Sequence, residues 1–211
     1  MEALAIIFFA LAVSADGFIA GLAYGIKKIR IPFLSLIVIA SASALAVSCS
    51  MVLGQGIAAI LLPETAKRIG AFLLILMGIF FLTKALCDRL DNLPVSEDEP
   101  LVTLNLKSLG IVIKILKEPV AADMDASGEI SQKEAFFLGL ALAVDAMGVG
   151  IGIAMTGYNI LFTALSVGVL KFILVNVGIG LGKIMKNESI RSIASFVPGL
   201  VFLLIGIMEF L

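Results

Sequence analysis

Long apolar segments constrain the fold of this sequence more than any other feature. The first, from Ala3 to Ile26, can cross the ~30 Å hydrocarbon core of a bilayer as an α-helix. Backbone polar groups find no water inside a bilayer, so such segments must be helical. We therefore expect an all-α integral membrane protein with several passes through the cell membrane. The six expected spans are residues 3–26, 33–62, 69–86, 134–157, 160–184 and 193–211.

The composition agrees with a membrane location and excludes several kinds of site. The 211 residues are 61% hydrophobic and 15% charged, whereas a soluble domain has about a quarter of its residues charged. A net charge of −1 argues against nucleic acid as a partner. The chain has no histidine, and its two cysteines are not spaced as a metal-binding or redox pair. Any metal site must therefore be rich in oxygen ligands, which suit hard or borderline divalent cations.

Lysine and arginine residues predict the orientation. If the N-terminus is outside, the outer segments contain only Lys67 and Arg68. By the positive-inside rule, both termini then lie outside, the first span runs inward and the fourth runs outward. The basic residues of the inner segments are Lys27, Lys28, Arg30, Lys84, Arg89, Lys107, Lys114, Lys117, Lys133, Lys183, Lys186 and Arg191.

Two apolar runs in the first and fourth spans each carry one carboxylate. They are LAVSADGFIAG at residues 11–21 and LALAVDAMGVG at residues 140–150, and aligning Asp145 with Asp16 also aligns Gly150 with Gly21. Two halves of opposite orientation that share a motif form an inverted-topology repeat, which is typical of secondary transporters with a midplane site. The expected division is a first three-helix repeat at residues 1–86, a cytoplasmic loop at 87–133 with an interfacial segment at 104–116, and a second repeat at 134–211.

The paired aspartates are the main candidates for chemistry. An ionised Asp in a membrane helix costs a few kcal/mol, so Asp16 and Asp145 suggest two carboxylates that share a dehydrated divalent cation. The alternative is that each Asp is protonated or hydrogen-bonded and serves helix packing. Paired aspartates also suggest a membrane aspartyl protease, but Asp145 follows Ala-Leu-Ala-Val instead of a GxGD-type motif, so we expect no enzyme. Weaker ligand candidates are the second-span hydroxyls, which could equally form a packing face: Ser43, Ser48 and Ser50.

Lys171 is a third charge inside an expected span. It lies too far from either end of the fifth span for its side chain to reach the interface. One hypothesis makes Lys171 a counter-ion to Asp145 that the arriving cation displaces or that loses its proton; the other makes it part of a fixed structural salt bridge. Asn176, in the same span, is a weaker candidate for binding the cation or proton.

The central loop contains a second candidate metal site. In DMDASGEISQKE, residues 123–134, oxygen-bearing residues alternate as in an EF-hand calcium loop, with Gly128 at the sharp turn. A solvated acidic loop is the alternative. Because the last ligand opens the fourth span, a bound cation could order the start of the helix that carries Asp145. The proposed ligands are Asp123, Asp125, Ser127, Glu129 and Glu134.

The motifs SADGFIAGLAYGIKKIRIP and LAVDAMGVGIGIAM, joined by a loop containing ADMDASGEIS, resemble the YtaF group of sporulation membrane proteins within the wider family of the MntP manganese efflux pump. The resemblance covers nearly the whole chain and implies six helices in two inverted repeats. For the pump branch it implies Mn²⁺ export from the cytoplasm, with Asp16 and Asp145 matching the aspartates that hold the cation. Pump members carry a membrane-embedded Glu in the second span, where residues 37–51 here offer only Ser and Cys as ligands.

Two functions follow as hypotheses. The first is a divalent cation exporter, with Mn²⁺ as the substrate, midplane carboxylates as ligands and exchange for protons as the coupling. The second is a non-transporting membrane protein of sporulation whose acidic loop senses Ca²⁺. The expected partners are the metal ion and the lipid bilayer, and we also consider a homodimer.

Overall fold

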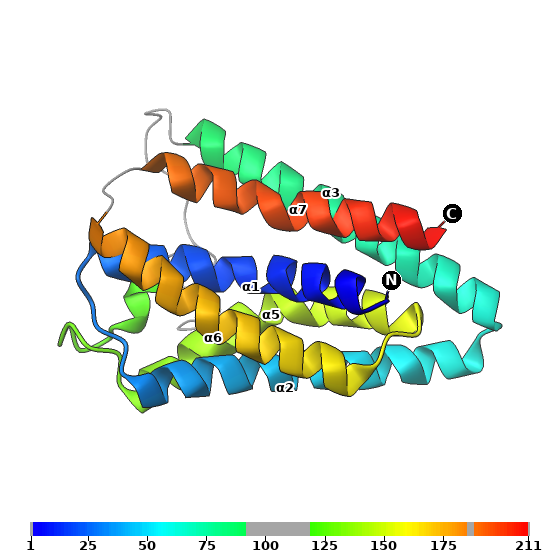
Figure 1. Ribbon diagram of the computed structural model, residues 1–211, viewed down its shortest axis with the longest axis horizontal. Coiled ribbons are helices and arrows are strands. Elements are labelled where there is room, and N and C mark those ends of the chain that lie inside the picture. The colour runs from blue at the N-terminus through cyan, green and yellow to red at the C-terminus, as the bar shows by residue number, and fades with distance from the viewer. Residues whose placement is uncertain (1, 92–118, 185–187, 211) are drawn as a thin grey trace, which may run out of the picture.

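The computed structural model describes residues 2–91, 119–184 and 188–210, except for the side chains of residues 2, 88–91, 119, 145 and 188–194. This part of the chain is helical, as expected, and its long helices lie along one another in a bundle (Figure 1). The elements are α1 (Glu2–Ile26), α2 (Phe33–Ile60), α3 (Pro63–Asp91), the short 3₁₀ helix η1 (Pro119–Ala122), α5 (Gln132–Met155), α6 (Ile160–Ile184) and α7 (Glu188–Phe210).

The helices have the length and hydropathy of membrane spans. α1, α2, α3 and α6 each contain a stretch long and apolar enough to cross a bilayer. α5 is bent into two arms and provides a fifth span if the two arms are counted as one. These arms, Gln132–Val144 and Ala146–Met155, meet at an angle of 48°. In α7 the described apolar stretch is the shorter Ser195–Phe210. The all-helical membrane fold is thus confirmed, with four or five spans in the described residues.

Some expected helix ends were wrong. α3 begins at Pro63 instead of residue 69, because proline is well suited to the first turn of a helix, where its missing N–H is not needed. α3 also continues to Asp91, into the segment expected to be loop, and α2 ends at Ile60. The interfacial segment expected at 104–116 lies outside the described residues.

The helices pack in three principal pairs. α1 packs against α6, α2 against α5 and α3 against α7. The helices of the first two pairs run in the same direction along the bundle, whereas α3 and α7 run in opposite directions (Figure 1). α1 begins and α7 ends at the same end of the bundle, here called the terminal end, and the α1–α2 connection lies at the opposite loop end (Figure 1).

Glycines bring α1 and α6 into backbone contact. A Cβ atom added at Gly21 would meet the carbonyl oxygen of Val175, and one added at Gly178 would meet that of Phe18. Small residues allow such close approach in lipid, where helix association depends on packing and hydrogen bonds rather than on exclusion of water. The register between α1 and α6 is therefore fixed over several turns.

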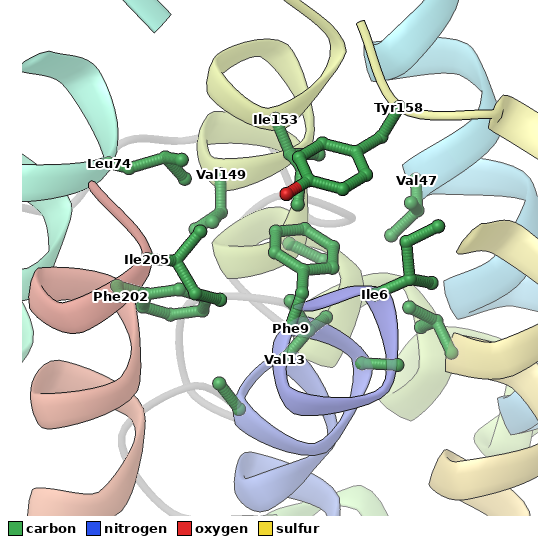
Figure 2. Packing of buried hydrophobic residues seen from close by; sticks show 14 of the residues in the cluster. Ile6, Phe9, Val13, Val47, Leu74, Val149, Ile153, Tyr158, Phe202 and Ile205 are labelled. Carbon is green, nitrogen blue, oxygen red and sulfur yellow. The ribbon is translucent and has the colours of Figure 1, made fainter. Parts of the chain in front are cut away.

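Two clusters of buried apolar side chains fill the bundle. The cluster in the terminal half brings together side chains such as Phe9 and Val13 of α1, Val149 of α5 and Phe202 of α7 (Figure 2). The cluster in the loop half includes Tyr24, on the same helix α1. Residues of α1 that lie between Val13 and Tyr24 are therefore near the middle of the bundle, which is where the sequence places Asp16.

Candidate functional site

An ion pair between Asp16 of α1 and Lys171 of α6 lies in the middle of the bundle. The Lys171 ammonium is 2.5 Å from Oδ1 of Asp16 and 3.4 Å from the carbonyl oxygen of Val13. Lys171 is fully buried, whereas the Asp16 side chain retains 22% of its exposure. Oδ1 of Asp16 also accepts a hydrogen bond of 2.7 Å from the backbone N–H of Gly17. The two charges therefore neutralise each other at a position where the Lys171 side chain is fully buried.

A small cavity adjoins the pair. Its volume is about 20 Å³, room for about one water molecule or a bare metal ion. Four helices contribute to its wall, and Asp16 supplies its only charged group among the residues that the structure describes. The lining residues are Ala12, Val13, Asp16, Phe81, Ala146, Val149, Pro198 and Phe202.

Lys171 has a partner that the sequence analysis did not name. Among the described side chains its ammonium pairs with Asp16, and the counter-ion hypothesis for Asp145 stays a prediction. The side chain of Asp145 lies outside the described residues, although its backbone is part of α5. Asn176 does not join the pair: its side chain is exposed, and its amide donates to the carbonyl oxygen of Phe172 on its own helix. A step of five residues from Lys171 turns Asn176 to another face of α6.

The three candidate hydroxyls of α2 have different surroundings. Ser48 is half-buried and donates to the carbonyl oxygen of Ala44, and Ser50 is buried and donates to that of Val47. Ser43 is also fully buried, but its hydroxyl has no hydrogen-bond partner in the part of the chain that the structure describes. Ser43 is therefore the hydroxyl that is free to bind something else.

The acidic loop, residues 123–134, gathers three carboxylates. Oxygen atoms of Asp123, Asp125 and Glu134 all lie within 4.8 Å of one another. Oxygens bound to one Ca²⁺ at about 2.4 Å are at most about 5 Å apart, so this spacing is compatible with a shared cation. Backbone N–H groups of Ser127 and Gly128 donate to Asp123, and Gly128 has the positive φ of 78° that the sharp turn requires.

Glu134 of the acidic loop is also the cap of α5. Ser131 is the N-cap residue, and it forms a reciprocal capping box with Glu134. The other carboxylate oxygen of Glu134 accepts a hydrogen bond from the backbone N–H of Met124. The carboxylate of Glu129 is not among the three that come together, and Glu129 itself is exposed.

The acidic loop is attached to the connection between α1 and α2. Arg30 forms a parallel backbone bridge with this loop: its N–H donates to the carbonyl of Gly128, and its carbonyl accepts from Ile130. Ile130 is fully buried, and its own carbonyl accepts a hydrogen bond from the Ser35 hydroxyl. The loop is therefore joined to the start of α5 and to the end of α1, the two helices that carry Asp145 and Asp16.

At the terminal end, Glu209 of α7 links three segments. It pairs with Lys67 of α3 at 3.3 Å and accepts a hydrogen bond of 2.5 Å from Tyr158, which lies between α5 and α6. Glu209 therefore lies at the end of the last helix, remote from Asp16 along the bundle.

Apolar helices of spanning length around a buried ion pair define the chain as a multi-pass plasma-membrane protein. Comparison with known proteins identifies its family. A family model described as "Putative manganese efflux pump" matches residues 105–210. The "Probable sporulation protein YtaF" of Bacillus subtilis strain 168 is 34% identical over 209 residues, covering 99% of this chain and all of the relative. The chain therefore belongs to the MntP family.

Members named as pumps match shorter parts of the chain. The "Putative manganese efflux pump MntP" of Clostridium perfringens strain SM101 is 32% identical over 91 residues, 43% of this chain and 42% of that protein. The protein of the same name from Pseudomonas savastanoi pv. phaseolicola is 32% identical over 66 residues, 31% of this chain and 34% of that protein. No solved structure is significantly similar. The family is thus named for transport, not for an enzyme activity.

Proposed function

We propose that the chain exports a divalent cation, with Mn²⁺ as the substrate and Asp16 and Asp145 as the shared ligands. The observation that carries this proposal is the buried ion pair: a carboxylate in mid-bundle is costly in a membrane and marks a pathway for ions or protons. The small cavity beside Asp16 supports a site of ionic size. Family membership supports a metal as the cargo and outward movement as the direction.

An inverted repeat of residues 1–86 and 134–211, joined by residues 87–133, is part of the proposal. In this repeat α1 corresponds to α5, and α2 corresponds to α6. The counterpart of the α1–α6 pair is therefore the α2–α5 pair, and both are principal contacts. Within the α3–α7 pair the contacts recur in the same way. A Cβ atom at Gly78 would meet Leu203 and the carbonyl of Gly199, and one at Gly206 would meet Ile75 and the carbonyl of Ala71. Such paired contacts support a two-fold relation between the halves.

Buried apolar side chains lie on both sides of the proposed site along the bundle. The terminal-half cluster covers one side of Asp16 and the loop-half cluster covers the other. We infer that this conformation is occluded and that one half rocks against the other during transport, as in other transporters built from inverted repeats. The basic residues Lys27, Lys28 and Arg30 at the loop end support a cytoplasmic location for that end and outside termini. Homodimer formation stays a prediction.

Flux measurements test this function. We expect the full chain in proteoliposomes to move Mn²⁺ down its gradient, and Asp16→Asn and Asp145→Asn each to abolish this flux. An imposed pH gradient should change the Mn²⁺ rate if protons are exchanged. Glu64→Gln is a matched control, because Glu64 is an exposed carboxylate in the first turn of α3.

Three results would contradict the transport proposal. They are an inactive native chain that is folded and correctly inserted, full activity of both aspartate variants, or loss of flux in the Glu64→Gln control. Parallel assays with Ca²⁺ and Mg²⁺ decide which hard cation is the cargo, because all three accept oxygen ligands.

A second candidate function has one specific observation in its favour. The convergence of Asp123, Asp125 and Glu134 supports a Ca²⁺-sensing loop in a non-transporting membrane protein, and the name of the Bacillus subtilis relative supports a role in sporulation. Glu134→Gln separates the two functions, because glutamine also forms a capping box while the charge and the hydrogen bond accepted from Met124 are lost. Ca²⁺ binding that disappears in Glu134→Gln, in a chain without Mn²⁺ flux, would favour the sensor.

A further inference from the structure

Ser43 of α2 and Lys171 of α6 occupy corresponding positions. Aligning α6 with α2 so that Lys171 falls on Ser43 also places Gly182 on Gly54. A Cβ atom at Gly182 would meet the carbonyl of Leu22 on α1, and one at Gly54 would meet the carbonyl of Ile151 on α5. The alignment of Asp16 with Asp145 independently makes Leu22 and Ile151 equivalent. The two interfaces therefore have the same register.

This register places Ser43 beside position 145. On α5, Gly139 contacts Ile39 of α2, and Gly150 contacts Ser50, so the stretch around Ser43 lies level with the residues between those glycines. Ser43 thus stands to position 145 as Lys171 stands to Asp16. Where one half offers an ammonium, the other half offers a neutral hydroxyl.

The hydroxyl of Ser43 is the group that the fold leaves unused. It is fully buried and lacks a hydrogen-bond partner among the described residues, whereas the equally buried Ser50 donates to its own helix. A buried polar group without a partner costs free energy, so its presence calls for a ligand that satisfies it. Serine oxygens are suitable neutral ligands for hard divalent cations.

We propose that the cation site is one-sided: the divalent cation binds on the α2–α5 side with the Ser43 hydroxyl as a ligand, while the Lys171 ammonium occupies the corresponding place beside Asp16 as a tethered cation. This inference rests on the proposed transport function and specifies its site. Lys171 keeps Asp16 neutralised when no metal is present, and it competes with the metal for the Asp16 carboxylate.

Binding measurements on two buried serines test the role of Ser43. Mn²⁺ affinity is measured by isothermal titration calorimetry on the full chain in detergent, together with thermal unfolding. Ser43→Ala should weaken Mn²⁺ binding by about 10-fold, as loss of a supporting ligand group does, and leave unfolding unchanged or stabilised. Ser50→Ala is the control and should change binding by less than about 2-fold, because that hydroxyl already has a partner.

Variants at Lys171 test the competing ammonium. Lys171→Gln should bind Mn²⁺ at least about 10-fold more tightly than the native chain, because a buried charge pair no longer has to be broken. Ser43→Lys should lose Mn²⁺ binding, because a second ammonium then fills the remaining place. The double exchange Ser43→Lys with Lys171→Ser moves the ammonium to the corresponding position and should restore binding to within about 10-fold of the native chain.

The outcomes separate this inference from the transport proposal. A native chain that neither binds nor moves Mn²⁺ overturns both. A native chain that transports Mn²⁺, with an affinity unchanged in Ser43→Ala and in Lys171→Gln, overturns the one-sided site alone. An equal loss in Ser43→Ala and Ser50→Ala would also overturn it, since the effect would then come from helix packing.

Discussion

The α1–α6 and α2–α5 interfaces share a register but differ in what they bury. Between α1 and α6, glycines meet backbone carbonyls and the Asp16–Lys171 ion pair closes the middle. Between α2 and α5, Ser43 occupies the lysine's position and Ser50 packs on Gly150. The scaffold can therefore be nearly symmetric while its chemistry is not. The proposed transporter would have two related halves that alternate and one well-defined place for its cargo.

The largest expected effect is a difference in stability between variants at Lys171 and at Ser43, the corresponding positions of α6 and α2. Lys171→Gln should lower the free energy of unfolding in the absence of metal by about 3–5 kcal/mol, because it leaves the Asp16 charge buried without its partner. Ser43→Ala should leave it unchanged or raise it slightly, because no hydrogen bond is lost. Reversible unfolding in detergent measures both.

The double variant Asp16→Asn with Lys171→Gln sharpens that comparison. Removing both charges should recover most of the lost stability, because neither buried charge is then left alone. If Lys171→Gln and Ser43→Ala proved equally destabilising, the charge of Lys171 would make no difference to stability. The α1–α6 and α2–α5 interfaces would then not differ in their central interaction.

The second prediction compares the equivalent glycines Gly21 and Gly150. Gly21→Ala should destabilise the chain by about 2–3 kcal/mol, because the new methyl group meets the backbone carbonyl of Val175, which cannot move aside. Gly150→Ala should cost less than about 1 kcal/mol, because the methyl group meets the Ser50 side chain, which can rotate.

The control for these glycines is Gly56→Ala in the same detergent assay. A Cβ atom at Gly56 would meet nothing within 4 Å, so alanine should be neutral or stabilise α2 slightly. Equal losses in Gly21→Ala and Gly150→Ala would mean that both interfaces are limited by backbone contact.

The sequence alone predicted the membrane class, the all-helical fold and which spans carry the charged residues. Hydropathy depends on composition within one segment, so it needs no knowledge of neighbours. The pairing of Lys171 with Asp16 was not predictable from the same pattern, because it depends on which helix packs against α6 and in which register. Each half has one carboxylate in the middle of a span, Asp16 or Asp145, and hydropathy does not show which of the two lies beside Lys171.

One signal for Ser43 was present in the sequence. The alignment of the two aspartates covered only the first and fourth spans; a similar alignment of the second and fifth would have placed Lys171 on Ser43 and Gly182 on Gly54. The start of α3 was missed for a different reason. The expected third span leaves out Pro63, although the fixed φ of proline favours the first turn of a helix.

A third prediction concerns an asymmetry at the terminal end. Glu209 joins Lys67 and Tyr158, whereas the corresponding positions for Tyr158 and Glu209 in the first half are the apolar Ile29 and Phe81. Glu209→Gln should cost about 1 kcal/mol of stability, since the pair with the half-exposed Lys67 is screened by water and the hydrogen bond from Tyr158 is only weakened. Tyr158→Phe should cost a similar amount, and no change in either variant would show that this end is held by packing alone.

The smallest expected effect belongs to the acidic loop, which is present only between the halves. Hydrogen bonds from Ser127 to Asp125 lower the pKa of that carboxyl below its ordinary value of 3.8. A lowered pKa means that Asp125 stays ionised to a lower pH. Its contribution to cation binding is complete above the ordinary pKa and is lost as the pH falls through the lowered pKa.

Ca²⁺ titrations of the full chain at pH 7 and pH 5 should therefore agree as far as Asp125 is concerned. Ser127→Ala removes the side-chain hydrogen bond, so Asp125 should gain its proton at a higher pH than in the native chain and Ca²⁺ binding should begin to weaken at that higher pH. A pH dependence identical to that of the native chain would show that Asp125 takes no part in holding the cation.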